Sequence, residues 1–283
     1  MRAMTGGIAA AWRIVADTAV YRVRKREAGN LVTSMTLAVA LSLPWLDIAW
    51  RFAFGLLLNL FVYLLNDCFD VRLDLDAPGR DHERTKFLAA HTRAGWAAVG
   101  ALTVVIAVVG AFHGAGLLLS FATTVVVIAA YSAWLKRLPV VDVLAMGAWG
   151  ITMALVGFPL ASRPGWWLAG LLGFLCMVTE VVQVIRDEAS DRAAGVRTTA
   201  VVFGSGAAGW IGRFLVVASA AYAVAFLHRW LGLALLLGVL VPLSPQRIGR
   251  SWDILRALFG LTWLVLLFFF YREGTLCGWI PVG

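Results

Sequence analysis

Long apolar runs separated by short charged breaks dominate this chain. A bilayer core of about 30 Å needs about 20 apolar residues per spanning helix, and irregular backbone cannot face lipid, so each run is predicted to be a helix. The pattern predicts an all-α polytopic membrane protein with nine transmembrane helices. The predicted spans cover residues 29–48, 51–67, 95–112, 115–132, 139–161, 166–185, 206–226, 229–244 and 253–271.

The N-terminal segment follows a different pattern. Residues 8–27 lack a continuous apolar run and end in a basic stretch over residues 21–26. Such a segment is typical of an amphipathic helix at the membrane surface rather than of a cleaved signal peptide. Three regions are therefore predicted: an interfacial segment (1–28), a transmembrane domain (29–271) and a short C-terminal tail (272–283).

Composition supports a membrane protein, and the basic residues predict its orientation. Hydrophobic residues make up 61% of the chain and charged residues only 14%, unlike a soluble domain. Cytoplasmic segments of membrane proteins carry an excess of lysine and arginine. Of the 24 such residues, 20 lie on the side of the N-terminus, and the other four are Arg51, Arg163, Arg229 and Arg272. We therefore expect an integral protein of a bacterial inner membrane, with the N-terminus and the connections after the second and sixth spans in the cytoplasm.

The net charge of +8 does not predict nucleic-acid binding, because the basic residues are dispersed over loops that flank apolar runs. Membrane lipids with anionic headgroups and an anionic substrate are the expected partners.

Two acidic clusters stand at the ends of apolar runs, after the second and the sixth predicted spans. Their members are Asn66, Asp67, Asp70 and Asp74 in the first cluster and Asp187 and Asp191 in the second. Spacings of three or four residues place the acids of each cluster on one face of a helix. Carboxylates beside a bilayer are costly to keep, and Mg²⁺ commonly takes one or two carboxylates together with phosphate oxygens and water. The two clusters together predict metal-assisted diphosphate chemistry.

A simpler interpretation is that these acids only end helices and face water. That interpretation is the better one for a single pair of acids four residues apart. Here, however, both clusters lie on the same predicted side, in the two longest connections. Like charges so arranged repel unless a cation or basic groups lie among them, which favours a shared site.

A third element completes an ordered set of motifs. The segment Tyr131-Ser132-Ala133-Trp134-Leu135-Lys136 follows the fourth predicted span. Together with the two clusters, it resembles the UbiA superfamily of intramembrane prenyltransferases, whose motifs read NDxxDxxxD, YSxxLK and DxxxD. The last motif is followed in the family by a segment with glycine and threonine, which is similar to residues 192–199 here. The resemblance covers roughly residues 20–271. It implies nine helices around a central cavity that opens to a cytoplasmic cap.

The resemblance also implies roles for individual residues. Asn66, Asp67, Asp70, Asp74, Asp187 and Asp191 would bind Mg²⁺ and, through it, an isoprenyl diphosphate. Lys136 would contact phosphate as a fixed positive charge near Tyr131, with Arg72 and Arg192 as further donors. Asn30, at the start of the first span, is similar to the polar residue that many relatives place near the acceptor. Among these residues, the catalytic set would be Asp67, Asp70, Lys136, Asp187 and Asp191.

The implied activity is transfer of a prenyl group from its diphosphate to an acceptor, with an aromatic acceptor as the leading prediction. Residues 77–90 depart from the segment that follows the first motif in aromatic prenyltransferases, and this difference concerns the acceptor. A terpene cyclase without an acceptor and a polyprenyl-phosphate phosphoribosyltransferase are alternatives within the superfamily. A secondary transporter is a less favoured alternative, because its ionisable groups would more often lie in broken helices at mid-membrane.

Overall fold

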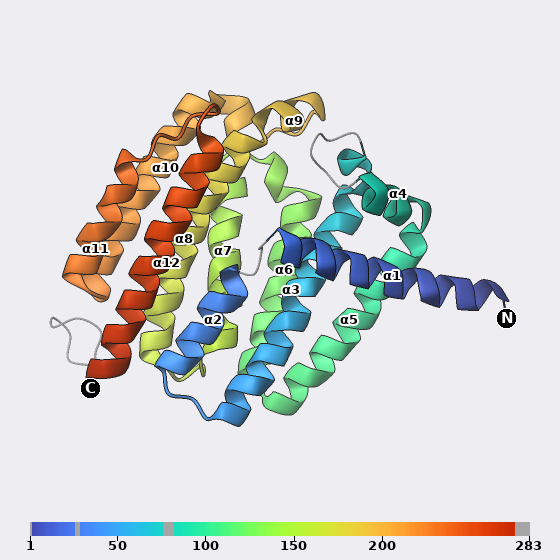
Figure 1. The fold of residues 1–283 in the computed structure, drawn as a ribbon, viewed down its shortest axis with the longest axis horizontal. Coiled ribbons are helices and arrows are strands. Elements are labelled where there is room, and N and C mark those ends of the chain that lie inside the picture. The colour runs from blue at the N-terminus through green and yellow to red at the C-terminus, as the bar shows by residue number, and fades with distance from the viewer. Residues whose placement is uncertain (1, 26–28, 76–81, 275–283) are drawn as a thin grey trace.

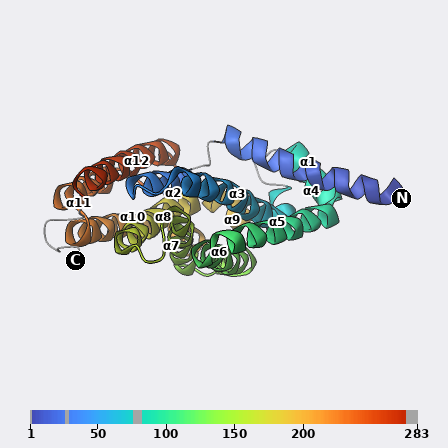
Figure 2. The same cartoon turned by 90° about the horizontal axis from the view of Figure 1, so that it is seen from below.

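The computed structural model describes residues 2–25, 29–75 and 82–274. These residues form helices joined by short connections, and no strand occurs among them. Figure 1 shows most helices running side by side, with α1 (Arg2–Arg24) lying across them. From below, the bundle is elongated and flattened (Figure 2). The predicted all-α class is confirmed.

Six helices within the described residues are long and apolar enough to cross a membrane. They are α3 (Trp45–Asp74), α5 (Thr92–His113), α6 (Ala115–Ala133), α8 (Arg163–Arg186), α10 (Thr199–Phe226) and α12 (Ile248–Glu273). Shorter apolar helices match the other three predicted spans, so nine crossings remain a prediction. These are α2 (Gly29–Ala40), α7 (Val141–Ala154) with the 3₁₀ helix η2 (Leu155–Gly157), and α11 (Arg229–Leu235) with η3 (Leu236–Leu240).

The first two helix boundaries differ from the prediction because of a proline. The predicted first span, 29–48, was too long, since α2 ends at Ala40. Pro44, which lacks an N–H and cannot continue a helix, instead precedes the first residue of α3. As a result α3 starts at Trp45 rather than at residue 51, and it extends to Asp74. The first acidic cluster therefore lies within the last turns of a long helix.

Arg51, one of the four basic residues that the pattern assigns to the side opposite the N-terminus, lies inside α3. It is buried, and it donates hydrogen bonds of 2.9 Å to the Asp47 carboxylate and of 2.9 Å to the carbonyl oxygen of Val156. A buried arginine needs such partners. Arg51 therefore joins α3 to η2 rather than marking a loop.

The seventh predicted span, 206–226, also begins earlier than expected. Helix α10 starts at Thr199 and changes direction at Gly204, whose φ of 82° and ψ of 155° are not helical. Glycine adopts this conformation without the steric penalty of a side chain. Because it begins at Thr199, α10 follows α9 (Glu188–Ala193) after a short connection.

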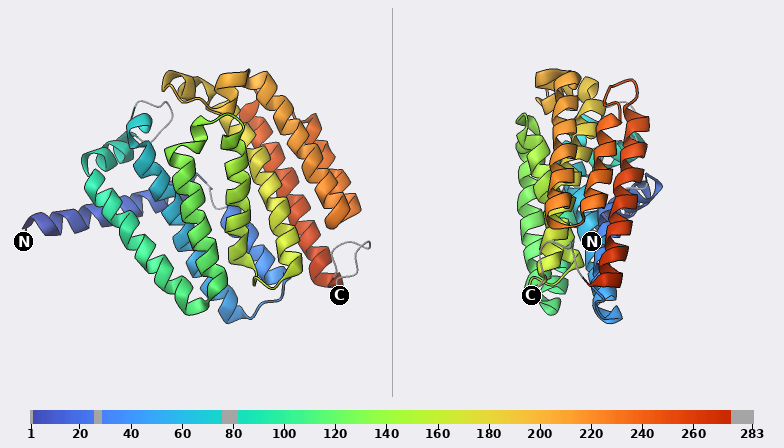
Figure 3. Two further views of the ribbon diagram at one scale, coloured as in Figure 1. Left: turned by 180° about the vertical axis from the view of Figure 1, so that it is seen from behind. Right: turned by 90° about the vertical axis from the view of Figure 1, so that its left-hand side faces the viewer.

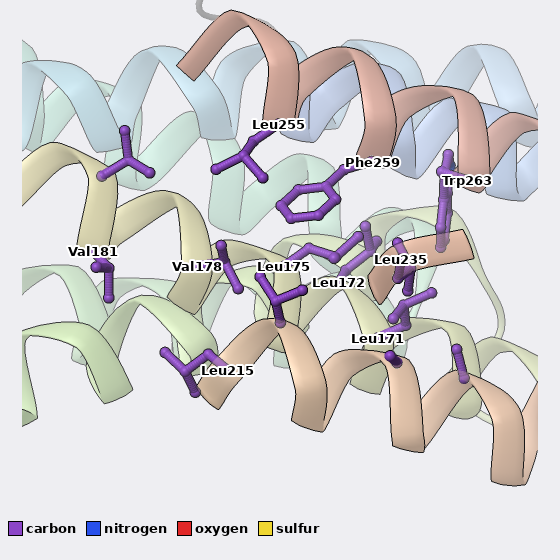
Figure 4. Close-up of a cluster of buried hydrophobic side chains, with 14 of the residues drawn as sticks. Leu171, Leu172, Leu175, Val178, Val181, Leu215, Leu235, Leu255, Phe259 and Trp263 are labelled. Atoms are coloured by element: carbon purple, nitrogen blue, oxygen red, sulfur yellow. The ribbon is translucent and has the colours of Figure 1, made fainter. Parts of the chain in front are cut away.

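Two apolar clusters hold the bundle together. Figure 4 shows the first, in which Val178 and Leu175 of α8 face Leu215 of α10 and Leu255 and Phe259 of α12. The second is formed largely by α3, α5, α6 and α7. In a membrane, close packing rather than removal from water drives such association, and small residues allow it.

Helix α7 approaches α8 closely through glycine. A side chain added at Gly150 would come within 2.8 Å of the carbonyl oxygen of Leu172, so only glycine fits there without a shift. This packing fixes α7 against α8, the helix that carries Glu180 and ends at the second acidic cluster.

Short helices gather at one end of the bundle. Helix α4 (His82–Ala90) follows the first acidic cluster, and α9 (Glu188–Ala193) carries Asp191 of the second. Both lie at the upper end in Figures 1 and 3. The connections after α3 and α8 thus share one end, which the basic residues predict to be cytoplasmic. A cap over a central cavity, like the interfacial position of α1, remains a prediction.

Candidate active site

Two arginines enclose the Asp67 carboxylate of the first cluster. Asp67 is 2% exposed, and each of its oxygens accepts a hydrogen bond. Arg22 of α1 donates from Nη2 to Oδ1 at 2.7 Å, and Arg84 of α4 donates from Nη1 to Oδ2 at 2.5 Å. Asp67 is therefore compensated by charges from two elements outside its own helix.

Aromatic rings hold these two guanidinium groups in place. The Arg22 guanidinium carbon lies 4.2 Å from the ring centre of Tyr63, and that of Arg84 lies 4.5 Å from the ring centre of Tyr21. Rings attract cations over their faces. Neither arginine was predicted as a site residue, because their partner in the fold lies 45 and 17 residues away in the sequence.

Lys136 lies directly against the first acidic cluster. Lys136 belongs to the 3₁₀ helix η1 (Leu135–Arg137), is buried, and donates from Nζ to Oδ1 of Asp70. One turn earlier, the Ser132 hydroxyl donates to Oδ1 of Asn66 at 3.0 Å. The end of α6 therefore packs its polar residues against the last turns of α3.

Tyr131 points to a carboxylate that the sequence analysis missed. Its hydroxyl donates to Oε1 of Glu180 at 2.7 Å, and Glu180 is 4% exposed within α8. Ionisable groups inside membrane helices are costly and usually functional. The signal was present, because Glu180 is the only charged residue in the predicted span 166–185.

Among the residues that the structure describes, the carboxylate charges of the second cluster have fewer cationic partners than those of the first. Asp187 accepts two hydrogen bonds of 2.8 Å from its neighbour Arg186, at a partly exposed position. Asp191 lies in α9, where burial and the nearby Asp187 charge raise its pKa to about 6. Asp70 raises this pKa further and Lys136 lowers it, so the residues of both clusters share one electrostatic environment.

The other predicted residues lie in varied surroundings. Arg192 donates to Glu188 at 2.8 Å with an exposed side chain, and Arg72 is also exposed. Asn30 is partly buried on α2, and its Oδ1 lies 3.9 Å from Sγ of Cys176 in α8. The side chain of Asp74 lies outside the described residues. The structure thus brings Asp70, Lys136 and Asp191 together but places Arg192 in a surface ion pair.

The donor set fits Mg²⁺ held jointly with a phosphate-bearing substrate. Within the described residues, no group of three histidine, cysteine or acidic side chains is close enough to hold a metal alone. The available donors of Asn66, Asp70, Asp187 and Asp191 are oxygens, which Mg²⁺ prefers, and it commonly keeps positions for phosphate and water. Beside Asp191, the buried Thr198 hydroxyl lowers the pKa of the carboxyl group and places a further oxygen next to it.

The fold and this site define a polytopic α-helical membrane protein with an oxygen-rich, cation-compatible centre at one end of its bundle. The model of the UbiA prenyltransferase family matches residues 30–257, which is most of the chain. The protein therefore belongs to the UbiA prenyltransferase family, as the motifs indicated.

Solved structures share the fold at low sequence identity. A UbiA homologue from Archaeoglobus fulgidus bound to DMAPP and Mg²⁺ is 17% identical, with a TM-score of 0.65 over 86% of this chain and 96% of that one. The same homologue bound to GPP and Mg²⁺ gives 16% identity and a TM-score of 0.64, over 86% of this chain and 97% of that one. A structure concerning digeranylgeranylglyceryl phosphate synthase is 13% identical, with a TM-score of 0.66 over 90% of this chain and 98% of that one. No curated protein matches the sequence significantly.

Proposed function

We propose that this protein transfers a prenyl group from an isoprenyl diphosphate to an acceptor within the membrane, with Mg²⁺ as cofactor. The observation that carries the proposal is the convergence of Asp70, Lys136 and Asp191, which come from three elements at one end of the bundle. Family membership supports the reaction class. The Archaeoglobus fulgidus homologue bound to DMAPP or GPP with Mg²⁺ supports the choice of donor and metal.

The residues take different roles in this proposal. Mg²⁺ would be held by the oxygens of Asn66, Asp70, Asp74, Asp187 and Asp191. Asp67, predicted from the motif as another ligand, already accepts hydrogen bonds at both oxygens from Arg22 and Arg84. Asp67 is buried and its partners come from two other helices, whereas Asp187 is paired with its own neighbour Arg186 at a partly exposed position. We therefore assign Asp67 to holding Arg22 and Arg84 beside the diphosphate.

The reaction begins with ionisation of the donor. The allylic C–O bond breaks and its electron pair leaves with the diphosphate, where Lys136 stabilises the growing negative charge. Bound Mg²⁺ supplies Lewis-acid stabilisation of the same charge. The surrounding apolar helices exclude water from the allylic cation, and an acceptor atom then bonds to it and loses a proton.

An aromatic molecule is the acceptor that we propose. The test uses purified protein with geranyl, farnesyl or geranylgeranyl diphosphate, with and without a hydroxybenzoate, and mass spectrometry of the lipid extract. We expect a prenylated aromatic product that forms only with Mg²⁺. A cyclised hydrocarbon without acceptor would instead indicate a terpene cyclase, and prenylated membrane lipid would indicate a lipid acceptor. Undiminished turnover in excess chelator would reject the metal mechanism.

A further inference from the structure

Asp142 is a buried carboxylate that the reaction proposed above does not use. It is 1% exposed and lies in the first turn of α7. Its oxygens accept hydrogen bonds from the Thr199 N–H at 2.7 Å, from the Thr199 hydroxyl and from the Val143 N–H at 2.9 Å. A buried carboxylate requires such partners. Asp142 therefore ties the start of α7 to the start of α10, 57 residues further along the chain.

Thr199 in turn holds an unusual backbone conformation. Its hydroxyl oxygen accepts a hydrogen bond of 2.7 Å from the N–H of Val140, which has a φ of 70° and a ψ of −40°. A β-branched residue with positive φ is a genuine outlier that persists only where its surroundings enforce it. Val140 lies between η1, which carries Lys136, and α7. Thr199 therefore fixes the path of the chain that leaves Lys136.

The same threonine ends the segment that carries the second acidic cluster. The Val196 N–H donates to the backbone oxygen of Asp191 at 2.8 Å, which closes the turn after α9. The next buried residue, Thr198, lies beside the Asp191 carboxylate. Thr199 follows immediately and is fully buried against Asp142. One hydrogen-bonded link thus joins the segment of Lys136 to the segment of Asp191.

We propose that Asp142 and Thr199 are positioning residues that fix the separation between Lys136 and Asp191, so that both face one bound diphosphate. Neither residue needs to touch the substrate. The inference rests on the proposed function, and it gives roles to two residues to which the sequence motifs assigned none. Strain at Val140 supports it, because strained backbone concentrates where geometry serves a site.

The test compares Thr199→Val, which removes the hydroxyl at constant shape, with Thr199→Ser, which keeps it. Ser251→Ala is the matched control, because its buried hydroxyl donates to Pro242 at 2.6 Å and joins a connection to the start of α12 without touching either cluster. The measurements are the KM for geranyl diphosphate and the rise in Tm on adding inorganic diphosphate with Mg²⁺. The second measurement requires no turnover.

We expect Thr199→Val to raise the KM about tenfold or more and to reduce the diphosphate-induced rise in Tm, since small misplacements of binding groups are costly. Thr199→Ser should stay near wild type. Ser251→Ala should lower the Tm of the free protein without changing the KM. A Thr199→Val protein with wild-type KM and a wild-type rise in Tm, or one that changes only as Ser251→Ala does, would overturn the inference.

A second substitution distinguishes positioning from general loss of structure. Glycine adopts positive φ without strain, so Val140→Gly added to Thr199→Val should recover part of the KM. No recovery would argue against the role of Val140. If Thr199→Val does not fold, Asp142→Asn takes its place with the same expected changes. Wild-type protein that shows no Mg²⁺-dependent turnover would contradict the proposed function, whereas active wild type with unaffected variants would contradict this inference alone.

Discussion

The two acidic clusters differ in how their charges are compensated. The first receives cations from three other elements, because Arg22 and Arg84 bind Asp67 and Lys136 binds Asp70. In the second, Asp191 lies partly buried near another acid, and its pKa is raised to about 6. The protein's own cations therefore neutralise the carboxylates of Asp67 and Asp70 in the first cluster. The second cluster would be stabilised most by a bound cation such as Mg²⁺.

Removing a carboxylate from either cluster should have the largest effect. We expect Asp70→Ala and Asp187→Ala each to lower kcat/KM by about 10²–10³-fold, because each removes charge that acts on the leaving diphosphate. The assay is release of diphosphate from geranyl diphosphate at saturating Mg²⁺. Asp17→Ala, which removes a surface ion pair with Arg13, is the control and should keep wild-type activity. Wild-type rates in either cluster variant would refute the assignment.

Stability should separate the clusters in the absence of metal. Asp67→Asn removes the buried carboxylate charge that pairs with two largely buried arginines, and it should destabilise the protein by up to about 3–5 kcal/mol. Asp191→Asn removes a charge that is already poorly compensated and should leave the free energy of unfolding unchanged or slightly higher. Thermal unfolding of both proteins in detergent with chelator measures the difference. Equal losses of stability would remove the contrast between the clusters.

Protonation should weaken metal binding at the second cluster. The raised pKa means that Asp191 takes up a proton as the pH falls through about 6, and a protonated carboxyl is a poor ligand for Mg²⁺. The Mg²⁺ concentration that gives half-maximal activity should therefore rise below about pH 6. Excess Mg²⁺ should restore most of the rate. A loss of rate at low pH with an unchanged Mg²⁺ requirement would place the titrating group elsewhere.

The smallest effect is expected at the surface of the second cluster. Arg192 pairs with Glu188 on an exposed face, so Arg192→Ala should change stability by less than about 1 kcal/mol and the KM for the donor by less than about threefold. Lys136→Gln, which removes a buried cation at the first cluster, should have a much larger effect on kcat/KM. A large rise in KM for Arg192→Ala would restore the phosphate-binding role that the motif implied.

Apolar runs predicted the helices well because each run is long and the membrane leaves the backbone few alternatives. The early end of α2 could have been predicted from Pro44, since proline cannot continue a helix. The start of α10 at Thr199 was harder to predict, because Gly204 and Ser205 interrupt its apolar residues and the hydrogen bonds to Asp142 of α7 hold its first residue.

Within the site, the sequence identified residues with a motif and missed those that act through distant partners. The acidic clusters and Lys136 have local spacing that indicates their chemistry. The roles of Arg22 and Asp142 depend on hydrogen-bond partners 45 and 57 residues away, and a single sequence does not show such contacts. Glu180 is intermediate between these two groups. A single acid in an apolar helix can be recognised in the sequence, but its hydrogen-bond partner Tyr131 cannot.

The central claim is that both clusters bind one Mg²⁺-diphosphate unit, and a double-mutant cycle on Asp70 and Asp187 tests it most directly. The measurement is the Tm rise caused by inorganic diphosphate with Mg²⁺ in wild type, Asp70→Asn, Asp187→Asn and the double variant. We predict that each single variant loses nearly all of this rise and that the double variant loses no more, because residues of one site are strongly non-additive. Separate, additive losses, or a full rise in excess chelator, would contradict the account.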